Sequence, residues 1–220
     1  MSIIYRTTLV PGKLELLTEW LPTRTWYQVT GGRPALQKAG GFRLDDPEGE
    51  VGIEFMVVAD TSGAEVTVYH VPLTYRGGPL VEGEDALVGT TEHGILGRRW
   101  VYDGTRDPVL VTQLVALIQG EVKPQAQSES HTPDPTVHAR PATDGAVRQA
   151  GLAAVDGVMG TEVQVGLAAG GQLVVHVMRA LAPVLEAPGE FGDYGYVTAT
   201  WQLAAGTPPA RGVFAFAELR

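Results

Sequence analysis

The alternation of apolar and polar side chains between Val51 and Asp107 constrains the fold more than any other feature of this sequence. In VGIEFMVVAD (51–60) the odd-numbered residues are apolar up to Val57, and Glu54 falls on the opposite face of a strand with period two. The turn DTSG (60–63) leads into a second apolar run at 66–73, which we expect to return antiparallel. A glycine-punctuated loop and a third strand at 98–102 complete the predicted sheet.

Two flanking segments have the apolar spacing of helices. KLELLTEWL (13–21) places leucines three and four residues apart, with Pro11 just before it. The second segment has stronger local signals, because Asp107 is a good N-cap and Pro108 fits the first helical position. Apolar residues then recur every three or four positions until Gly120. We expect a helix with one buried face, and hence an α+β fold.

Three weaker features concern the strand boundaries. The stretch 22–41, with glycine pairs at 31–32 and 40–41, indicates a loop or a bent edge strand, and 42–44 a short strand. Pro72 has no N–H for a sheet ladder, so we expect its strand to end there or to lie at an edge.

The chain divides by composition into three parts. Residues 1–119 carry the predicted sheet and helices, and 120–145, with four prolines and few large apolar residues, indicate a linker or a mobile excursion. Residues 146–220 form a predicted β-rich subdomain. It has one hairpin around Gly170 and Gly171 and a second strand pair at 196–204 and 212–219, with no helix beyond a turn near 147–155.

Composition excludes several classes of function. The 220 residues include no cysteine, so disulfides, thiolate zinc sites and cysteine nucleophiles are impossible. The net charge of −9 without any basic segment disfavours nucleic acid and anionic membranes as partners. We find neither a signal peptide nor an apolar run long enough to span a membrane, so we expect a cytoplasmic protein.

Common catalytic motifs are missing as well. None of the four serines lies in a G-x-S-x-G turn, and no two glycines are separated by one residue, so nucleotide loops of the G-x-G and Walker types are absent. No histidine pair has the spacing of a helical zinc site. We therefore expect no metal and no cofactor.

Two groups of side chains are candidates for ligand binding. A polar group lies between glycines in the segment 89–99, where a ligand site or simply a salt-bridged loop would fit. Aromatic residues of the predicted sheet could stack on a sugar or belong to the core. The candidate residues are Trp26, Tyr69, Glu92, His93, Arg98, Arg99, Trp100 and Tyr102.

Three segments resemble a known family. MSIIYRTTLVPGKLELLTEWLPTRTWY, VYHVPLTYRGGPL and WVYDGTRDPVLVTQL are similar to the N-terminal cap domain of actinobacterial maltokinases, over roughly residues 1–119. The resemblance implies a cystatin-like curved antiparallel sheet with packed helices. In that family the cap precedes a kinase and does no chemistry itself.

The resemblance extends weakly into the C-terminal part. QLVVHVMRAL is similar in outline to the kinase N-lobe strand that holds a phosphate-binding lysine, but His176 stands at the lysine position and Arg179 falls one place late. This implies that 146–220 are a degenerate kinase N-lobe, with no catalytic lobe after it. A neutral imidazole replaces a fixed ammonium poorly beside phosphates.

Three hypotheses follow for the function. The first is a non-catalytic accessory or interaction protein of maltose, trehalose or α-glucan metabolism, whose partner is a kinase, a glycogen-branching enzyme or a trehalose synthase. The alternatives are a small-ligand or sugar-binding module, and a partial phosphotransferase that borrows a catalytic lobe. Edge strands in both halves leave the oligomeric state open.

Overall fold

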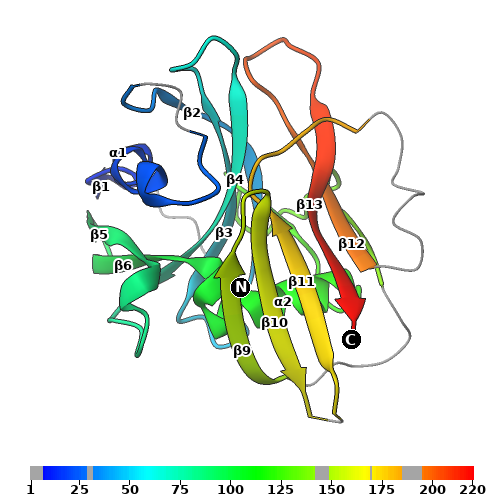
Figure 1. The fold of residues 1–220 in the computed structure, drawn as a ribbon. Helices are drawn as coiled ribbons and strands as arrows, with labels where there is room; N and C mark the ends of the chain where they lie inside the picture. The colour runs from blue at the N-terminus through cyan, green and yellow to red at the C-terminus, as the bar shows by residue number, and fades with distance from the viewer. Residues whose placement is uncertain (1–6, 29–31, 142–148, 169, 185–194) are drawn as a thin grey trace.

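The computed structural model describes residues 7–28, 32–141, 149–168, 170–184 and 195–220. It is a mostly antiparallel β-sheet with two short α-helices (Figure 1), which confirms the predicted antiparallel sheet and helices, although the chain is largely β. The strands follow the order β1-β5-β6-β4-β3-β2-β12-β13-β11-β10-β9, with β7 on β2 and β8 on β12.

Short 3₁₀-helices are labelled η. The elements up to residue 119 are β1 (Leu9–Val10), α1 (Lys13–Trp20), η1 (Leu21–Thr23), β2 (Leu36–Leu44), β3 (Gly52–Asp60), β4 (Thr67–Arg76), η2 (Glu84–Ala86), β5 (Leu87–His93), β6 (Gly97–Asp103), η3 (Gly104–Arg106) and α2 (Pro108–Ile118). Those that follow are β7 (Gln125–Ala126), β8 (His138–Arg140), β9 (Gln149–Asp156), β10 (Gly160–Leu167), β11 (Gln172–Met178), β12 (Gly195–Trp201) and β13 (Ala210–Leu219).

The strongest local signals of the sequence produce the expected elements. β3 and β4 form the predicted hairpin, with Phe55 opposite Pro72 and Asp60 opposite Thr67. The Asp107 side chain accepts a hydrogen bond from the Val109 N–H and so caps α2 as predicted. The buried surface of α2 is wider than one face, because Leu110, Val111, Gln113, Leu114, Val115, Leu117 and Ile118 are all buried.

Three boundary predictions are wrong. β2 is a full strand in the interior of the sheet, between β3 and β12, where we expected a loop or an edge. A register shift between Lys38 and Gly40 lets it bend, and the positive φ angles of Gly40 and Gly41 fit that bend. β5 was missed because its run of Gly89, Thr90 and Thr91 carries few apolar residues. β9 occupies 149–156, where we expected a turn, while 147–148 lie outside the described residues.

Pro72 neither ends its strand nor lies at an edge of the sheet, because the outer side of β4 has two successive partners. His70 donates its backbone N–H to the Arg179 carbonyl oxygen at 2.8 Å, whereas pairing with β6 starts at Leu73 opposite Asp103. Backbone groups alternate in direction along a strand, so Pro72 faces this same side. Its missing N–H falls at the change of partner, where it interrupts no ladder.

The strand path closes on itself between the two parts of the chain. The isolated bridge between Tyr69 and Ala180 connects β4 to the segment just after β11. From β11 the path continues through β13 and β12 to β2, where Trp201 pairs with Gly40. Six strands, three from each part, thus form a ring, and Figure 1 shows the N-terminal and C-terminal strands side by side.

Alternation along β3 separates two hydrophobic clusters. Phe55 and Val57 face the larger cluster, which also holds α2 and the inner faces of β10 to β13. Met56 and Val58 face the smaller cluster. This cluster is covered by Leu17 and Trp20 of α1 and by Leu21 of η1, and it also includes Trp26, Tyr27 and Tyr69. The larger core is therefore built from both parts of the chain.

The segment predicted as a linker lies along the sheet over its described residues, 120–141. Its β7 pairs with β2 and its β8 with β12, and Val137 is buried in the larger core. Arg43 donates to the carbonyl oxygens of Ala126 and Glu129 at 3.2 and 3.3 Å. Backbone pairing and polar contacts thus hold this segment with few apolar side chains. Residues 142–145 lie outside the described part.

Candidate functional site

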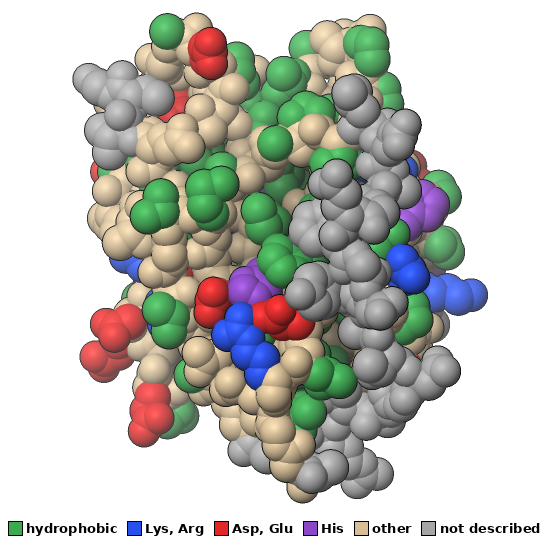
Figure 2. Space-filling model, turned by 45° about the vertical axis from the view of Figure 1, so that its right-hand side comes forward, with side chains coloured by type: hydrophobic (Ala, Val, Ile, Leu, Met, Phe, Trp, Pro, Cys, Tyr) green, Lys and Arg blue, Asp and Glu red, His purple; other side chains and the backbone are tan. Residues whose placement is uncertain are grey.

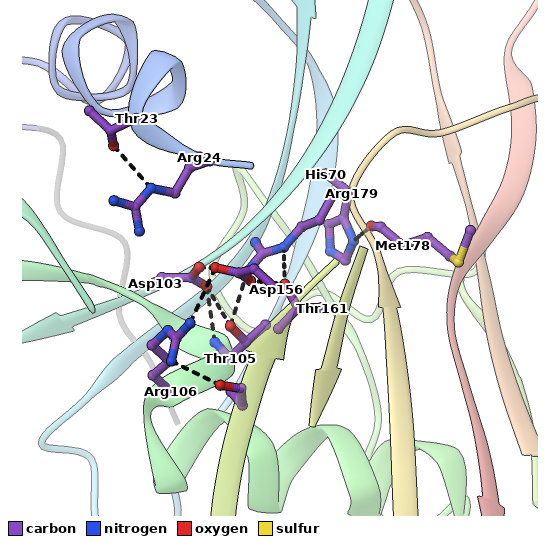
Figure 3. Close-up of polar contacts among 11 residues, drawn as sticks. Thr23, Arg24, His70, Asp103, Thr105, Arg106, Asp156, Thr161, Met178 and Arg179 are labelled. Atoms are coloured by element: carbon purple, nitrogen blue, oxygen red, sulfur yellow. Dashed lines mark hydrogen bonds and ion pairs between the residues drawn. The ribbon is translucent and has the colours of Figure 1, made fainter. Parts of the chain in front are cut away.

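Buried polar side chains gather where β6 and η3 meet β10 and β11 (Figure 3). Arg179, just after β11, is fully buried. Its Nη2 donates to Asp103 Oδ2 at 2.5 Å and to Thr105 Oγ1 at 3.0 Å, and its Nε donates to Thr161 Oγ1 at 2.9 Å. We call Asp103, Thr105, Thr161 and Arg179 the junction cluster. It connects side chains 74 to 76 residues apart in the chain.

A second ion pair extends the junction cluster. Arg106 Nη2 donates to Asp156 Oδ2 at 3.2 Å, and its Nη1 donates to the Ala154 carbonyl oxygen at 3.0 Å. The Thr161 hydroxyl donates to Asp156 Oδ1 at 2.6 Å. Burial alone would raise the pKa of Asp156, but the Thr161 hydrogen bond and the charges of Arg179 and Arg106 outweigh it, so the pKa lies below its ordinary value.

The motifs PLTYR (72–76) and YDGTRDP (102–108) meet at Asp107. Arg76 forms a bidentate pair with this carboxylate, with Nε–Oδ2 and Nη2–Oδ1 both at 2.7 Å. The Thr74 hydroxyl donates to the same carboxylate at 2.7 Å. Asp107 is fully buried, so these donors and the Val109 N–H satisfy its charge while it caps α2. The motif residues hold β4, η3 and α2 together.

Glu54 is the centre of another buried polar group. It accepts from Lys13 Nζ at 2.5 Å, from the Tyr75 hydroxyl at 2.6 Å and from Gln127 Nε2 at 2.7 Å. Burial opposes ionisation, but Lys13 and these hydrogen bonds prevail and hold the pKa of Glu54 below its ordinary value. Burial, together with the neighbouring Glu54 charge, raises the pKa of the Tyr75 hydroxyl well above its ordinary value. The carboxylate is saturated with donors.

Three of the predicted sugar-stacking aromatics lie in the interior. Trp26, Tyr69 and Tyr102 are 1%, 0% and 3% exposed, which leaves their faces covered by protein. The Tyr69 hydroxyl accepts from the Gln28 N–H at 3.0 Å, and the Tyr102 hydroxyl accepts from the Leu80 N–H at 2.9 Å. Trp100, on β6, is half-buried.

The predicted polar group lies along the β5–β6 hairpin. Glu92 and Arg98 are opposite each other and form an exposed ion pair at 2.8 Å. His93 Nδ1 accepts from the N–H groups of Ile95 and Leu96, and Arg99 donates to the Leu96 carbonyl oxygen. Burial and the Arg99 charge lower the pKa of His93. These contacts organise the turn of the hairpin.

His176, at the proposed lysine position, lies on β11 between two acidic side chains. Its Nδ1 is 3.6 Å from Glu162 of β10, and its Nε2 is 3.5 Å from Glu218 of β13. The ring stacks on Phe216 with centroids 4.4 Å apart. Arg220 also pairs with Glu218, so two carboxylates and one guanidinium surround the imidazole.

Sequence reasoning missed the residues that form the junction cluster. YDGTRDP was identified as a family motif, but nothing local shows that Asp103 and Thr105 contact Arg179. The only available signal was an arginine at the end of an apolar strand, QLVVHVMRAL, where a charge would be costly without a partner.

Several observations limit the chemistry of the described residues. No group of three or more His, Asp or Glu side chains among them is placed to hold a metal ion. No helix in this part combines the length and apolar character needed to cross a membrane. On the face shown in Figure 2, Lys and Arg side chains are scattered and form no basic stripe.

The first part of the chain is thus an antiparallel sheet with α1 on one face and α2 on the other, and the Arg76–Asp107 pair connects the sheet to α2. The family model of the maltokinase N-terminal cap domain matches residues 20–107. The chain therefore contains a maltokinase N-terminal cap domain over that range, and the resemblance seen in the sequence is confirmed there. A search of curated proteins found no match.

Proposed function

We propose that this protein is a non-catalytic accessory protein that binds an enzyme of maltose, trehalose or α-glucan metabolism. The cap domain match at residues 20–107 carries the proposal, because it relates the chain to maltokinase. The contacts of the described carboxylates and histidines provide the physical support.

The buried carboxylates are engaged in structural contacts. Glu54, Asp103 and Asp107 each accept from a cation and from at least one further donor. A general base needs a lone pair directed at a substrate proton. These groups are instead occupied by protein donors, which supports a role in the fold.

For the C-terminal part we propose a relic of a kinase N-lobe beside a cystatin-like cap. β9, β10 and β11 are successive antiparallel strands, and His176 lies on the third of them. In protein kinases the lysine that contacts the ATP phosphates also lies on the third strand. Glu162 and Glu218 flank His176 and Arg220 pairs with Glu218, so a phosphate there would meet two carboxylates and only one guanidinium. This disfavours the alternative of a partial phosphotransferase.

The sugar-binding alternative receives less support than the accessory role. Trp26 and Tyr69 could present a ring face to a sugar only after the smaller hydrophobic cluster had opened, and Tyr102 is only 3% exposed. Trp100 keeps part of its surface accessible. A thermal-shift titration with maltose, trehalose and maltose 1-phosphate tests this alternative, and a saturable shift abolished by Trp100→Ala would restore it.

The experiment for the accessory role is affinity capture from native cytosol with the full chain as bait, followed by identification of the bound enzymes. The exposed residues Val158 and Met159, 80% and 66% accessible, could retain proteins non-specifically. A bait with both replaced by serine is therefore run in parallel. The proposal predicts the same enzyme of glucan or trehalose metabolism on both baits, and its absence from both would refute it.

A further inference from the structure

Buried hydrogen-bond donors without acceptors concentrate in one region of the molecule. Six buried side-chain N or O atoms of the described residues lack a partner, and four of them are Trp20 Nε1, Trp26 Nε1, Arg106 Nε and Arg179 Nη1. In native proteins such groups are almost always paired with protein, water or an ion. An acceptor that is not one of these side chains would give the four donors a hydrogen-bond partner.

The tryptophans connect these donors in a continuous stack. The Arg179 guanidinium lies 4.7 Å from the centroid of Trp26, whose ring meets Trp20 edge-on with centroids 5.8 Å apart. The Arg24 guanidinium lies 5.0 Å from the centroid of Trp20. In Figure 3 the Arg24 side chain lies beside Thr23, on the segment that follows the first helix. Two of the three donors in this stack come from the cap segment.

The charge of the region favours an anion. Arg106 is paired with Asp156 and Arg179 with Asp103, whereas Arg24 stacks on Trp20, so its guanidinium adds one positive charge to the region. Arg24 is half-buried and donates its Nε to Thr23 at 3.0 Å. Its guanidinium is thus the most accessible cation of the stack, and we place the approach from solvent beside it.

We propose that the Trp20–Trp26–Arg179 stack binds a small oxyanion, a carboxylate or a phosphate group, which is reached past Arg24. The oxygens would accept from the indole N–H groups and from the free guanidinium nitrogen, since charged acceptors form the stronger hydrogen bonds. The proposal is independent of the accessory role, because it concerns a ligand and not a protein partner.

Titration with inorganic phosphate, followed by calorimetry and by ³¹P line width at constant ionic strength, tests the site. Trp26→Phe removes one N–H and keeps an aromatic ring, and Arg24→Gln removes the charge at the approach. Each should weaken phosphate binding by about tenfold or more. Arg98→Gln is the matched control, because Arg98 is an exposed arginine paired with Glu92 on the β5–β6 hairpin and is not part of the stack. It should bind like the wild type.

Two outcomes would overturn the proposal. The wild type could show no saturable phosphate or acetate binding, in which case water satisfies the donors. Alternatively, Arg24→Gln and Arg98→Gln could weaken binding equally, which would indicate general attraction to surface charge. Thermal unfolding of each variant shows whether a loss comes from misfolding, and Arg24→Gln provides the decisive comparison because Arg24 is only half-buried.

Discussion

Replacing Arg179 with alanine should destabilise the protein more than replacing any exposed arginine. The Arg179 and Asp103 side chains are 0% and 2% exposed, and the substitution leaves Asp103 as a buried carboxylate without its cation. Breaking one partner of a buried ion pair costs about 3–5 kcal/mol. Asp103 keeps two hydrogen bonds from Thr105, but the contact of Arg179 with Trp26 is lost too. We expect a loss within this range.

Urea unfolding followed by tryptophan fluorescence measures the free energy of unfolding of each variant. Arg98→Ala is the control, because its pair with Glu92 is exposed by 62% and 59% and should contribute about 0–1 kcal/mol. The double variant Asp103→Asn with Arg179→Met removes the stranded charge and should recover part of the loss. If Arg179→Ala costs no more than Arg98→Ala, the junction cluster does not hold the two parts together as we argue.

Three further predictions concern other parts of the fold. Burial lowers the pKa of His70 from 6.5 to about 3. Below pH 6.5 the imidazole is therefore protonated in the unfolded chain but not in the folded protein, and the free energy of unfolding falls by about 1.4 kcal/mol per pH unit as the pH drops. His70→Phe should remove that slope between pH 6.5 and 5 in pH-dependent urea titrations, and an unchanged slope would contradict the argument. Gly41→Ala should clearly lower the melting temperature, because Gly41 has a φ of +129° and a Cβ there would lie 2.3 Å from the Phe55 carbonyl oxygen. Gly32→Ala is the control, because a Cβ at Gly32 would meet open space, and equal shifts of the two melting temperatures would contradict this reasoning. Arg76→Ala strands the buried Asp107 and should cost about 3–5 kcal/mol in the same urea assay, and a loss below 1 kcal/mol would contradict the bidentate pair.

Elements with complete local signals could be predicted from the sequence. α2 is specified by Asp107, Pro108 and an apolar repeat, all within twelve residues. β3 and β4 follow from alternation with a turn between them. Elements without such signals were missed, since QAGLAAVD of β9 consists mainly of small residues that favour no period. The position of β2 depends on pairing with β12, which begins more than 150 residues later.

The candidate sites show the same division. The motifs around Asp107 could be found because each is a short run of unusual residues, but their contact is a property of the folded sheet. Arg179 and Asp103 are 76 residues apart, and no periodicity relates them. The sequence could not show whether the aromatic candidates are accessible. An aromatic residue in a strand pattern looks the same whether it lies in the core or on the surface, and Trp26 and Tyr69 turned out to be buried.

We propose that this chain acts through a protein partner and performs no phosphate chemistry itself. The most direct measurement is a calorimetric titration of the purified chain into purified maltokinase, glycogen-branching enzyme and trehalose synthase from the same organism. We predict saturable binding of fixed stoichiometry to one of them. Absence of binding to all three, together with transfer of phosphate from ATP to maltose by the chain alone, would contradict the account.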